Sequence, residues 1–269
     1  MRSFLLLIIP FIGFSQLSFT TIKLDENLQE TSGLEWYGDN FITHNDSGDK
    51  AKLYVFTPKG VLIKSIRFHE IKNKDWEDIA ADEHNYYIAD TGNNLANRKN
   101  LKIHILSKDL NIEGEIRIHY SAQKDFTKRV LNSFDAEALT VLGDSLALFS
   151  KNRLTQKTEL YIFPKKEGDY VLSPSASLEV ASLITAADYN QKHDLLALTG
   201  YNFKGEQFFY TATNFIKNGW DAIVLKKYFI PIEKAQIEAV KIKDTSKFWL
   251  TSEGEINGFA RLIELKVPK

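Results

Sequence analysis

The chain has 269 residues, 43% of them hydrophobic, which suffices for a sizeable core in one large β domain or two smaller ones. Its 34 basic and 35 acidic residues give a formal net charge of -1, which argues against a nucleic-acid partner or a polybasic membrane surface. The absence of cysteine excludes disulfides, thiolate metal sites and cysteine nucleophiles.

The N-terminus has the layout of a secretory signal peptide. Residues 4–14, FLLLIIPFIGF, form an apolar run between Arg2 and Ser15. The run is shorter than the roughly 20 apolar residues of a membrane-spanning helix, and an uncleaved anchor or a buried first strand is the alternative. We therefore expect a signal over residues 1–16 and a single exported domain over residues 17–269, periplasmic or secreted, with no membrane span once the signal is removed.

A unit recurs along the rest of the chain. It opens with a polar residue and a small residue before an aliphatic one, as in ETSGL from Glu30, DWEDI from Asp75, DAEAL from Asp135 and QIEAV from Gln236, with a looser copy, TAADY, from Thr185. Successive starts lie roughly 45 to 60 residues apart, close to the ~40–50 residues of known propeller repeats.

Each start precedes three further strand-like runs. In the second run, apolar and polar residues alternate and a polar loop follows, as in NFITHNDSGD from Asn40. The third run is rich in aromatic and β-branched residues, as in KLYVFT from Lys52. The outer runs are VLIKSIRF, GEIRIHY, DYVLSP and AIVLKKYF. The fifth unit ends after its third run, and SFTTIKL from Ser18 can supply the missing strand and protect the edge. The sequence thus predicts an all-β propeller of five four-stranded blades closed by an N-terminal strand.

Six blades are the alternative, with the extra one hidden in residues 121–134. This segment has too few alternating apolar residues for four strands, so we interpret it as a loop. Helices should be nearly absent, because no window shows sustained helical periodicity.

In a propeller, the loop that enters the innermost strand and the loop that follows the second strand lie on the same face. Polar residues of both kinds of loop should therefore converge at one mouth of the central channel. The strand starts contribute Glu30, Asp75, Glu77, Asp78, Asp135, Glu137, Asp188 and Glu238, and the second-strand loops contribute His44, Asn45, Asp46, Asp90, Asn93, Asn94, Lys151, Asn152, Arg153 and Glu253.

Such crowded carboxylates raise one another's pKa values unless a cation compensates, and hard oxygen ligands suit Ca²⁺. We predict Glu77, Asp78, Asp135 and Glu137 as metal ligands. The alternative role for acids at strand starts, which we consider for Asp75, Asp135 and Glu238, is to accept hydrogen bonds from backbone amides of the neighbouring blade.

The loops predict a site for a small polar or anionic ligand, and a protein partner stays open. The residues assigned to it are Asn45, Asp46, Asp90, Asn93, Asn94, Arg98, Lys151 and Arg153. Arg98 could clamp an anion bidentately, or be a solvated loop residue. Candidate catalytic residues are Glu77, Glu137 and His44. The sequence has no GxSxG, HExxH, GxxxxGK[ST] or GxGxxG motif, so enzymatic activity is an open question.

The runs ETSGL, THNDSGD, DWEDIA, ADTGNN followed by Arg98, DAEAL and LFSKNR together resemble a family of exported bacterial β-propellers of largely unknown function, similar to the phytase-like and SdiA-regulated-type propellers. The motifs cover about the first 150 residues, and the repeat pattern covers the rest. The resemblance implies a propeller fold, an extracytoplasmic location and calcium-dependent phosphoesterase chemistry. Those groups have a basic pocket for phosphate, for which Lys151, Arg153 and Arg98 are the candidates here. They usually have six units, whereas this chain has five.

The favoured hypothesis is a binding propeller that holds a cation or a small polar ligand at its acidic mouth without turnover. The first alternative is a calcium-dependent phosphoesterase or esterase-like hydrolase in which Glu77 or Glu137 activates water. The second is a structural envelope protein whose acidic residues hold the blades together.

Overall fold

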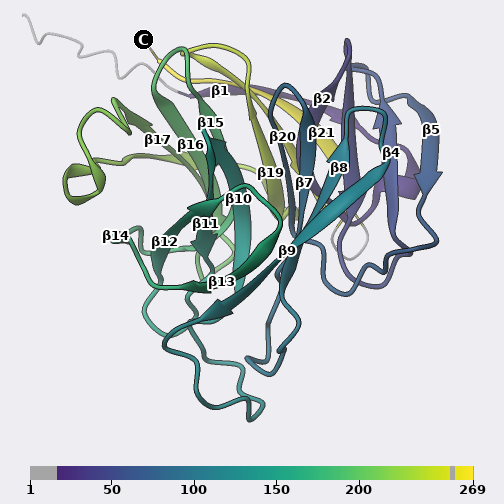
Figure 1. Ribbon diagram of the computed structural model, residues 1–269. Coiled ribbons are helices and arrows are strands. Elements are labelled where there is room, and N and C mark those ends of the chain that lie inside the picture. Colours follow the sequence, from purple (N-terminus) through teal and green to yellow (C-terminus); the bar gives the residue numbers. More distant parts are fainter. Residues whose placement is uncertain (1–16, 255–257, 269) are drawn as a thin grey trace, which may run out of the picture.

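A computed structural model describes residues 17–254 and 258–268, so the predicted signal lies outside the described residues. Within them the chain is built of β-strands, and its helical segments are two short 3₁₀ turns, η1 (Glu26–Leu28) and η2 (Trp220–Ala222). The strands form five sheets arranged around a central axis, with blade 1 in purple and blue on the right of Figure 1 and blade 4 in green on the left. The predicted five-bladed propeller is confirmed.

Within each blade, the first strand lies at the channel and the others follow it outward. Blade 1 contains β2 (Thr31–Tyr37), β3 (Asn40–Asn45), β4 (Lys52–Phe56) and β5 (Leu62–Arg67). Blade 2 contains β6 (Asp78–Ala81), β7 (Asn85–Asp90), β8 (Lys102–Ser107), β9 (Ile112–Tyr120) and an added strand, β13 (Gly168–Leu172). Blade 3 contains β10 (Ala136–Leu142), β11 (Ser145–Ser150), β12 (Lys157–Pro164) and β14 (Ala176–Glu179). Blade 4 contains β15 (Leu183–Asn190), β16 (Leu195–Tyr201), β17 (Gln207–Thr213) and β18 (Lys226–Ile230). Blade 5 contains β19 (Ile237–Ile242), β20 (Lys247–Ser252), β21 (Arg261–Lys266) and β1 (Ser18–Lys23).

The two ends of the described chain close the ring. β1 pairs antiparallel with β21, with Ser18 opposite Lys266 and Lys23 opposite Arg261, as the sequence predicts. The innermost strands β2, β6, β10, β15 and β19 each contact the next, and β19 contacts β2. The five strand starts therefore lie at one end of the channel.

The core lies between the blades. Along β11, Leu146 and Leu148 pack toward blade 2, while Ala147 and Phe149 pack toward blade 4. Successive side chains of a strand point to opposite faces, so a middle strand that is apolar at every position is buried on both sides. Each fully buried large side chain contributes roughly 1.5–3 kcal/mol, which is how the chain holds a ring without disulfides.

The outer strand of blade 3 differs from the prediction, which assigned it to DYVLSP. That segment forms β13, which pairs in parallel with β9 of blade 2 (Figure 1), and β14 completes blade 3. Arg117 of β9 donates two hydrogen bonds, 2.6 and 2.8 Å long, to the carboxylate of Asp169 in β13. The prediction was wrong because alternation identifies a strand but not its partner.

The start of blade 4 lies two residues earlier than the motif predicts. β15 pairs Ile184 with Gly200 and Ala186 with Thr199, which leaves Thr185 as a bulged residue. The bulged residues of blades 3 and 5 are Glu137 and Glu238, so Thr185 is their counterpart. Asp188, which the motif places at the mouth, instead lies near the other end of the channel.

Residues 121–134 form no strand, which agrees with the predicted loop and leaves no room for a sixth blade. The loop is held against blade 2, since the side-chain amides of Gln123 and Asn132 donate to the carbonyl oxygens of Ala96 and Asn94. Among the described residues, no helix has the length and apolarity needed to cross a bilayer.

Candidate functional site

Three carboxylates from blades 1 and 2 meet at the mouth of the channel. Asp75 and Glu77 precede β6, the innermost strand of blade 2, and Asp46 follows β3 of blade 1. One oxygen from each lies within 4.8 Å of the others, and we call these three residues the mouth triad. Glu77 also lies within this distance of Asp135 and Glu137, here called the paired acids. The loops that enter innermost strands and the loop that follows a second strand thus contribute to the same acidic cluster.

Local backbone features explain this arrangement. The bulge at Glu137 inserts one extra residue and re-aims its side chain, a common role of bulges beside functional sites. Gly92 follows β7, and its N–H donates to the carbonyl oxygen of Asp75 over 3.2 Å. A side chain at Gly92 would overlap the carboxylates of Asp75 and Glu77, so glycine lets the loop approach them.

The paired acids have basic partners. Lys151 Nζ forms an ion pair with Glu137, and Arg153 pairs with Asp135 and lies 3.8 Å from Glu137. The backbone N–H of Asn93 also donates to Asp135 over 2.6 Å. Burial raises the pKa of Glu137 to about 8 although Lys151 opposes the shift. Burial disfavours the charge of Lys151, but Glu137 and Glu238 outweigh it and raise the pKa well above its usual range.

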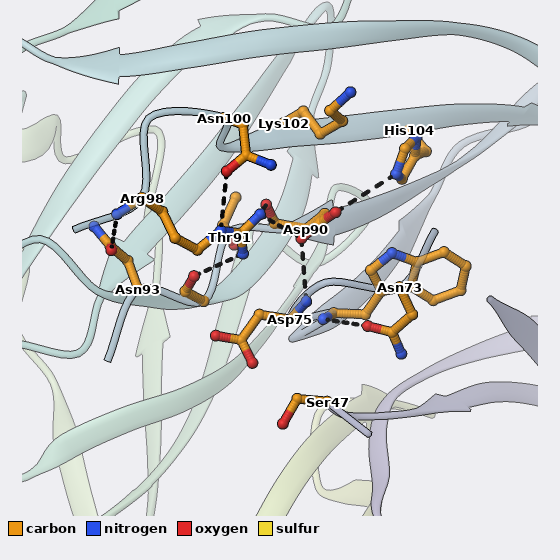
Figure 2. A network of polar contacts seen from close by, with 12 residues as sticks. Ser47, Asn73, Asp75, Asp90, Thr91, Asn93, Arg98, Asn100, Lys102 and His104 are labelled. Atoms are coloured by element: carbon orange, nitrogen blue, oxygen red, sulfur yellow. Dashed lines mark hydrogen bonds and ion pairs between the residues drawn. The ribbon is translucent and has the colours of Figure 1, made fainter. Parts of the chain in front are cut away.

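Within the described residues, the mouth triad forms no such ion pair, although Arg98 and Lys151 lie near enough to lower the pKa values of Asp75 and Asp46. Among the described residues, no hydrogen-bond donor reaches the carboxylate of Asp75 or Glu77, and Asp46 accepts only from the N–H of Ser47. Figure 2 shows the Asp75 carboxylate directed away from the contact that its backbone N–H makes to Asp90. Burial, reinforced by Asp46, raises the pKa of Asp75 to about 7, and burial with Glu137 raises that of Glu77 well above normal. These acids hold protons where a cation could replace them.

Asp90, Asn93 and Arg98 form a network beside the triad (Figure 2). Arg98 donates to Asp90 Oδ1 over 2.7 Å and to the carbonyl oxygen of Gly92 over 2.7 Å, and its N–H donates to Asn93 Oδ1 over 2.9 Å. Asn94 accepts from Arg153. These side chains fix the loops that carry Gly92, and Arg98 is engaged inside the protein.

His44 and Asn45 lie away from the triad. The ring of His44 is fully buried and packs edge-on against Trp76, with centroids 5.6 Å apart. Burial lowers the pKa of His44 to about 4, so the ring is neutral at physiological pH. Asn45 donates to the carbonyl oxygen of Asn27 over 2.9 Å and to Asp49 over 3.2 Å. His44 is therefore an interior residue.

Asp78 lies deeper in the channel than Glu77. Its carboxylate accepts backbone hydrogen bonds from Ile79 and Leu139, each 2.8 Å long, and from Ala187 over 3.3 Å. The donors belong to three innermost strands, so Asp78 joins blades 2, 3 and 4. Gly33 provides the space, since a side chain there would press on Asp78. Asp78 thus has the structural role that the sequence suggested for other acids.

A half-buried lysine that the sequence reasoning missed, Lys241, lies toward the end of the channel opposite the mouth. Lys241 Nζ is 2.6 Å from Glu35 and 2.9 Å from Asp188, and Asp188 also accepts from the N–H of Ile242 over 2.7 Å. Glu35, Asp78, Asp188 and Lys241 form what we call the inner cluster. A signal for Lys241 existed: it stands between Val240 and Ile242 in an innermost strand, where few side chains reach solvent.

Comparisons with known proteins identify the fold. No family model and no curated protein sequence matches this chain. Among solved structures, it is similar to the PQQ-bound aldose sugar dehydrogenase of Streptomyces coelicolor, with a TM-score of 0.53 and 12% identity over 94% of this chain and 99% of that one. A chain of a mitotic checkpoint complex gives a TM-score of 0.46 and 8% identity over 89% and 75%. The chain is, by its architecture and by the first of these likenesses, a β-propeller.

Proposed function

We propose that this protein is an exported binding propeller that holds a divalent cation, best matched by Ca²⁺, on Asp46, Asp75 and Glu77, and that a small polar or anionic ligand binds through that cation. One observation carries the proposal. Asp75 and Glu77 are partly and almost fully buried, their carboxylates gather with that of Asp46 within 4.8 Å, and no hydrogen-bond donor among the described residues reaches them.

The donor set favours calcium among common metals. Ca²⁺ takes six to eight oxygen ligands in flexible geometry, and three carboxylates with water can supply them. Transition metals such as zinc favour imidazole or thiolate, but His44 packs inside the blade and the chain has no cysteine. Mg²⁺ demands near-ideal octahedral geometry, which suits a loop-built site less well.

The mouth triad is a better cation site than the paired acids. Lys151 and Arg153 already contact Glu137 and Asp135, so a metal there would have to displace a buried ammonium or guanidinium group. In the triad the competitor is a proton, which rising pH removes. The triad therefore supports binding near neutral pH and above.

Binding without turnover is favoured because the basic residues near the mouth are already paired with carboxylates of the protein. Arg98, Lys151 and Arg153, the candidates for a phosphate pocket, each pair with an internal carboxylate. One observation favours a hydrolase as a second candidate: a carboxyl group with a pKa of about 7, as in Asp75, is suited to general-base catalysis beside a metal.

Isothermal titration with calcium chloride at pH 8 tests the proposal. We expect one saturable site in the wild type and at least tenfold weaker binding in Asp75→Asn and Glu77→Gln, since each removes a ligand charge. Asp109→Asn, an exposed acid in the β8–β9 turn, is the matched control and should bind like the wild type. No binding up to millimolar calcium, or equal affinity in all variants, would contradict the proposal.

Hydrolysis of p-nitrophenyl phosphate and p-nitrophenyl acetate, measured with calcium, separates binder from enzyme. A binder gives the same background rate for the wild type and Asp75→Asn. Calcium-dependent turnover that Asp75→Asn abolishes would establish the hydrolase instead.

A further inference from the structure

A cavity of about 390 Å³ opens at the end of the channel opposite the mouth. Its walls are the turns that follow β6, β10 and β15, and Lys241 of β19 contributes to its lining. The volume is within the roughly 300–1,000 Å³ of small-molecule sites. The innermost strands separate this cavity from the mouth triad, so it is a site of its own.

Two lysine–carboxylate pairs face the cavity. Lys165 Nζ lies 2.8 Å from Asp82 and joins blade 3 to blade 2, and Lys241 Nζ lies 2.9 Å from Asp188. The first pair is formally neutral. The second shares its lysine with Glu35, so it carries a net negative charge. An anion would meet no uncompensated positive charge here.

The acceptors of these pairs are largely used, while donors are left over. Asp82 accepts from the N–H groups of His84 and Asn85 and from the hydroxyl of Tyr87, besides Lys165. An ammonium group has three N–H donors, of which Lys241 gives one to Glu35 and one to Asp188. Its third N–H and the two N–H groups of Lys165 that Asp82 does not use are available to a ligand oxygen.

We propose that this cavity binds a small, neutral polyhydroxy compound, a monosaccharide or polyol. A hydroxyl group can accept from the ammonium of Lys165 or Lys241 and donate to the carboxylate of Asp188, which accepts only one hydrogen bond from the described residues on each oxygen, without adding charge. The rim carboxylates of Glu83 and Asp144 add further acceptors. Val141 and the ring of Tyr189 give the apolar surface that the C–H face of a sugar ring requires.

Saturation-transfer NMR and titration calorimetry with D-glucose, D-galactose and myo-inositol test the proposal, with sodium acetate and glycine as charged probes. EDTA in every sample removes calcium, so failure of the calcium proposal leaves this test intact. We expect saturable binding of at least one neutral probe and none of the charged ones. Lys165→Met should weaken binding about tenfold, because a donor to the ligand is lost while Asp82 keeps three others.

Val141→Trp fills the rim of the cavity and should abolish binding, whereas Asp109→Asn should leave it unchanged. Circular dichroism of each variant confirms folding. The proposal is overturned by absence of binding for all three neutral probes up to tens of millimolar, by preferential binding of acetate or glycine, or by unchanged affinity in Val141→Trp.

Discussion

The mouth triad and the inner cluster both place carboxylates in the channel, but they are compensated differently. In the inner cluster, Asp78 accepts three backbone hydrogen bonds and Lys241 bridges Glu35 and Asp188. In the mouth triad, the carboxylate of Glu77, next to Asp78 in sequence, has no donor among the described residues. Glu77 and Asp78 are adjacent in sequence, yet the fold supplies hydrogen-bond donors only to the carboxylate of Asp78.

This difference distinguishes the acids that join the blades from the acids to which we assign a cation. Buried polar groups normally have partners, since each unsatisfied one costs about 1–3 kcal/mol. The inner cluster follows that rule and joins the blades. In the triad, burial raises the pKa values of Asp75 and Glu77, and our proposal assigns a cation to these acids.

The largest effect should come from the inner cluster. Lys241→Met leaves Glu35 and Asp188 as buried acids without their shared cation, and we expect a loss of about 3–5 kcal/mol in the free energy of unfolding. Urea denaturation measures it. Lys192→Met, at an exposed position in the β15–β16 turn, is the control and should change stability by less than about 0.5 kcal/mol. A similar small loss for Lys241→Met would mean that the cluster does not hold the ring together.

The next effect is the pH dependence of the calcium-free protein. Burial raises the pKa values of Asp75 to about 7 and of Glu137 and Glu253 to about 8, above those of the unfolded chain near 4. The folded state therefore binds more protons between pH 4 and 8, and its stability falls as pH rises through this window. Each extra proton contributes about 1.4 kcal/mol per pH unit.

Denaturation in urea from pH 4.5 to 8.5, with EDTA, measures this fall. Calcium needs deprotonated ligands, so it should stabilise the protein more at pH 8 than at pH 5. Stability that rises over this window would show that the mouth acids are compensated after all.

The smallest effect distinguishes one acid of the triad. Asp75→Asn removes a carboxyl group whose pKa is raised to about 7, so without calcium it should stabilise the protein, and it should do so more at pH 8.5 than at pH 5. Thermal melting at both pH values measures this, with Asp109→Asn as control. Destabilisation at pH 8.5 would indicate that Asp75 has a structural partner.

Much of the fold could be predicted from the sequence, because strand alternation and the recurring strand start are local signals. The partner of a strand is not local, and this is why DYVLSP was assigned to blade 3. The start of blade 4 was misplaced because Thr185 stands where other blades carry Glu137 or Glu238, so the motif was aligned to Asp188 instead.

For the candidate site, the sequence predicted that both kinds of loop meet at one mouth, and it included Asp46, Asp75 and Glu77. It could not show which acids have partners. Lys151 pairs with Glu137 across a turn of blade 3, and Asp188 meets Lys241 from another blade. Only the packed structure brings these charges together, so Asp78 was grouped with the metal ligands although its donors lie on three strands.

Anomalous diffraction from a crystal grown with calcium chloride at pH 8 tests the central claim most directly. Our account predicts a single calcium peak at the mouth, bound by Asp46, Asp75 and Glu77, with Lys151 and Arg153 still on Glu137 and Asp135. An empty triad at millimolar calcium, or a peak between the paired acids with Lys151 displaced, would contradict it.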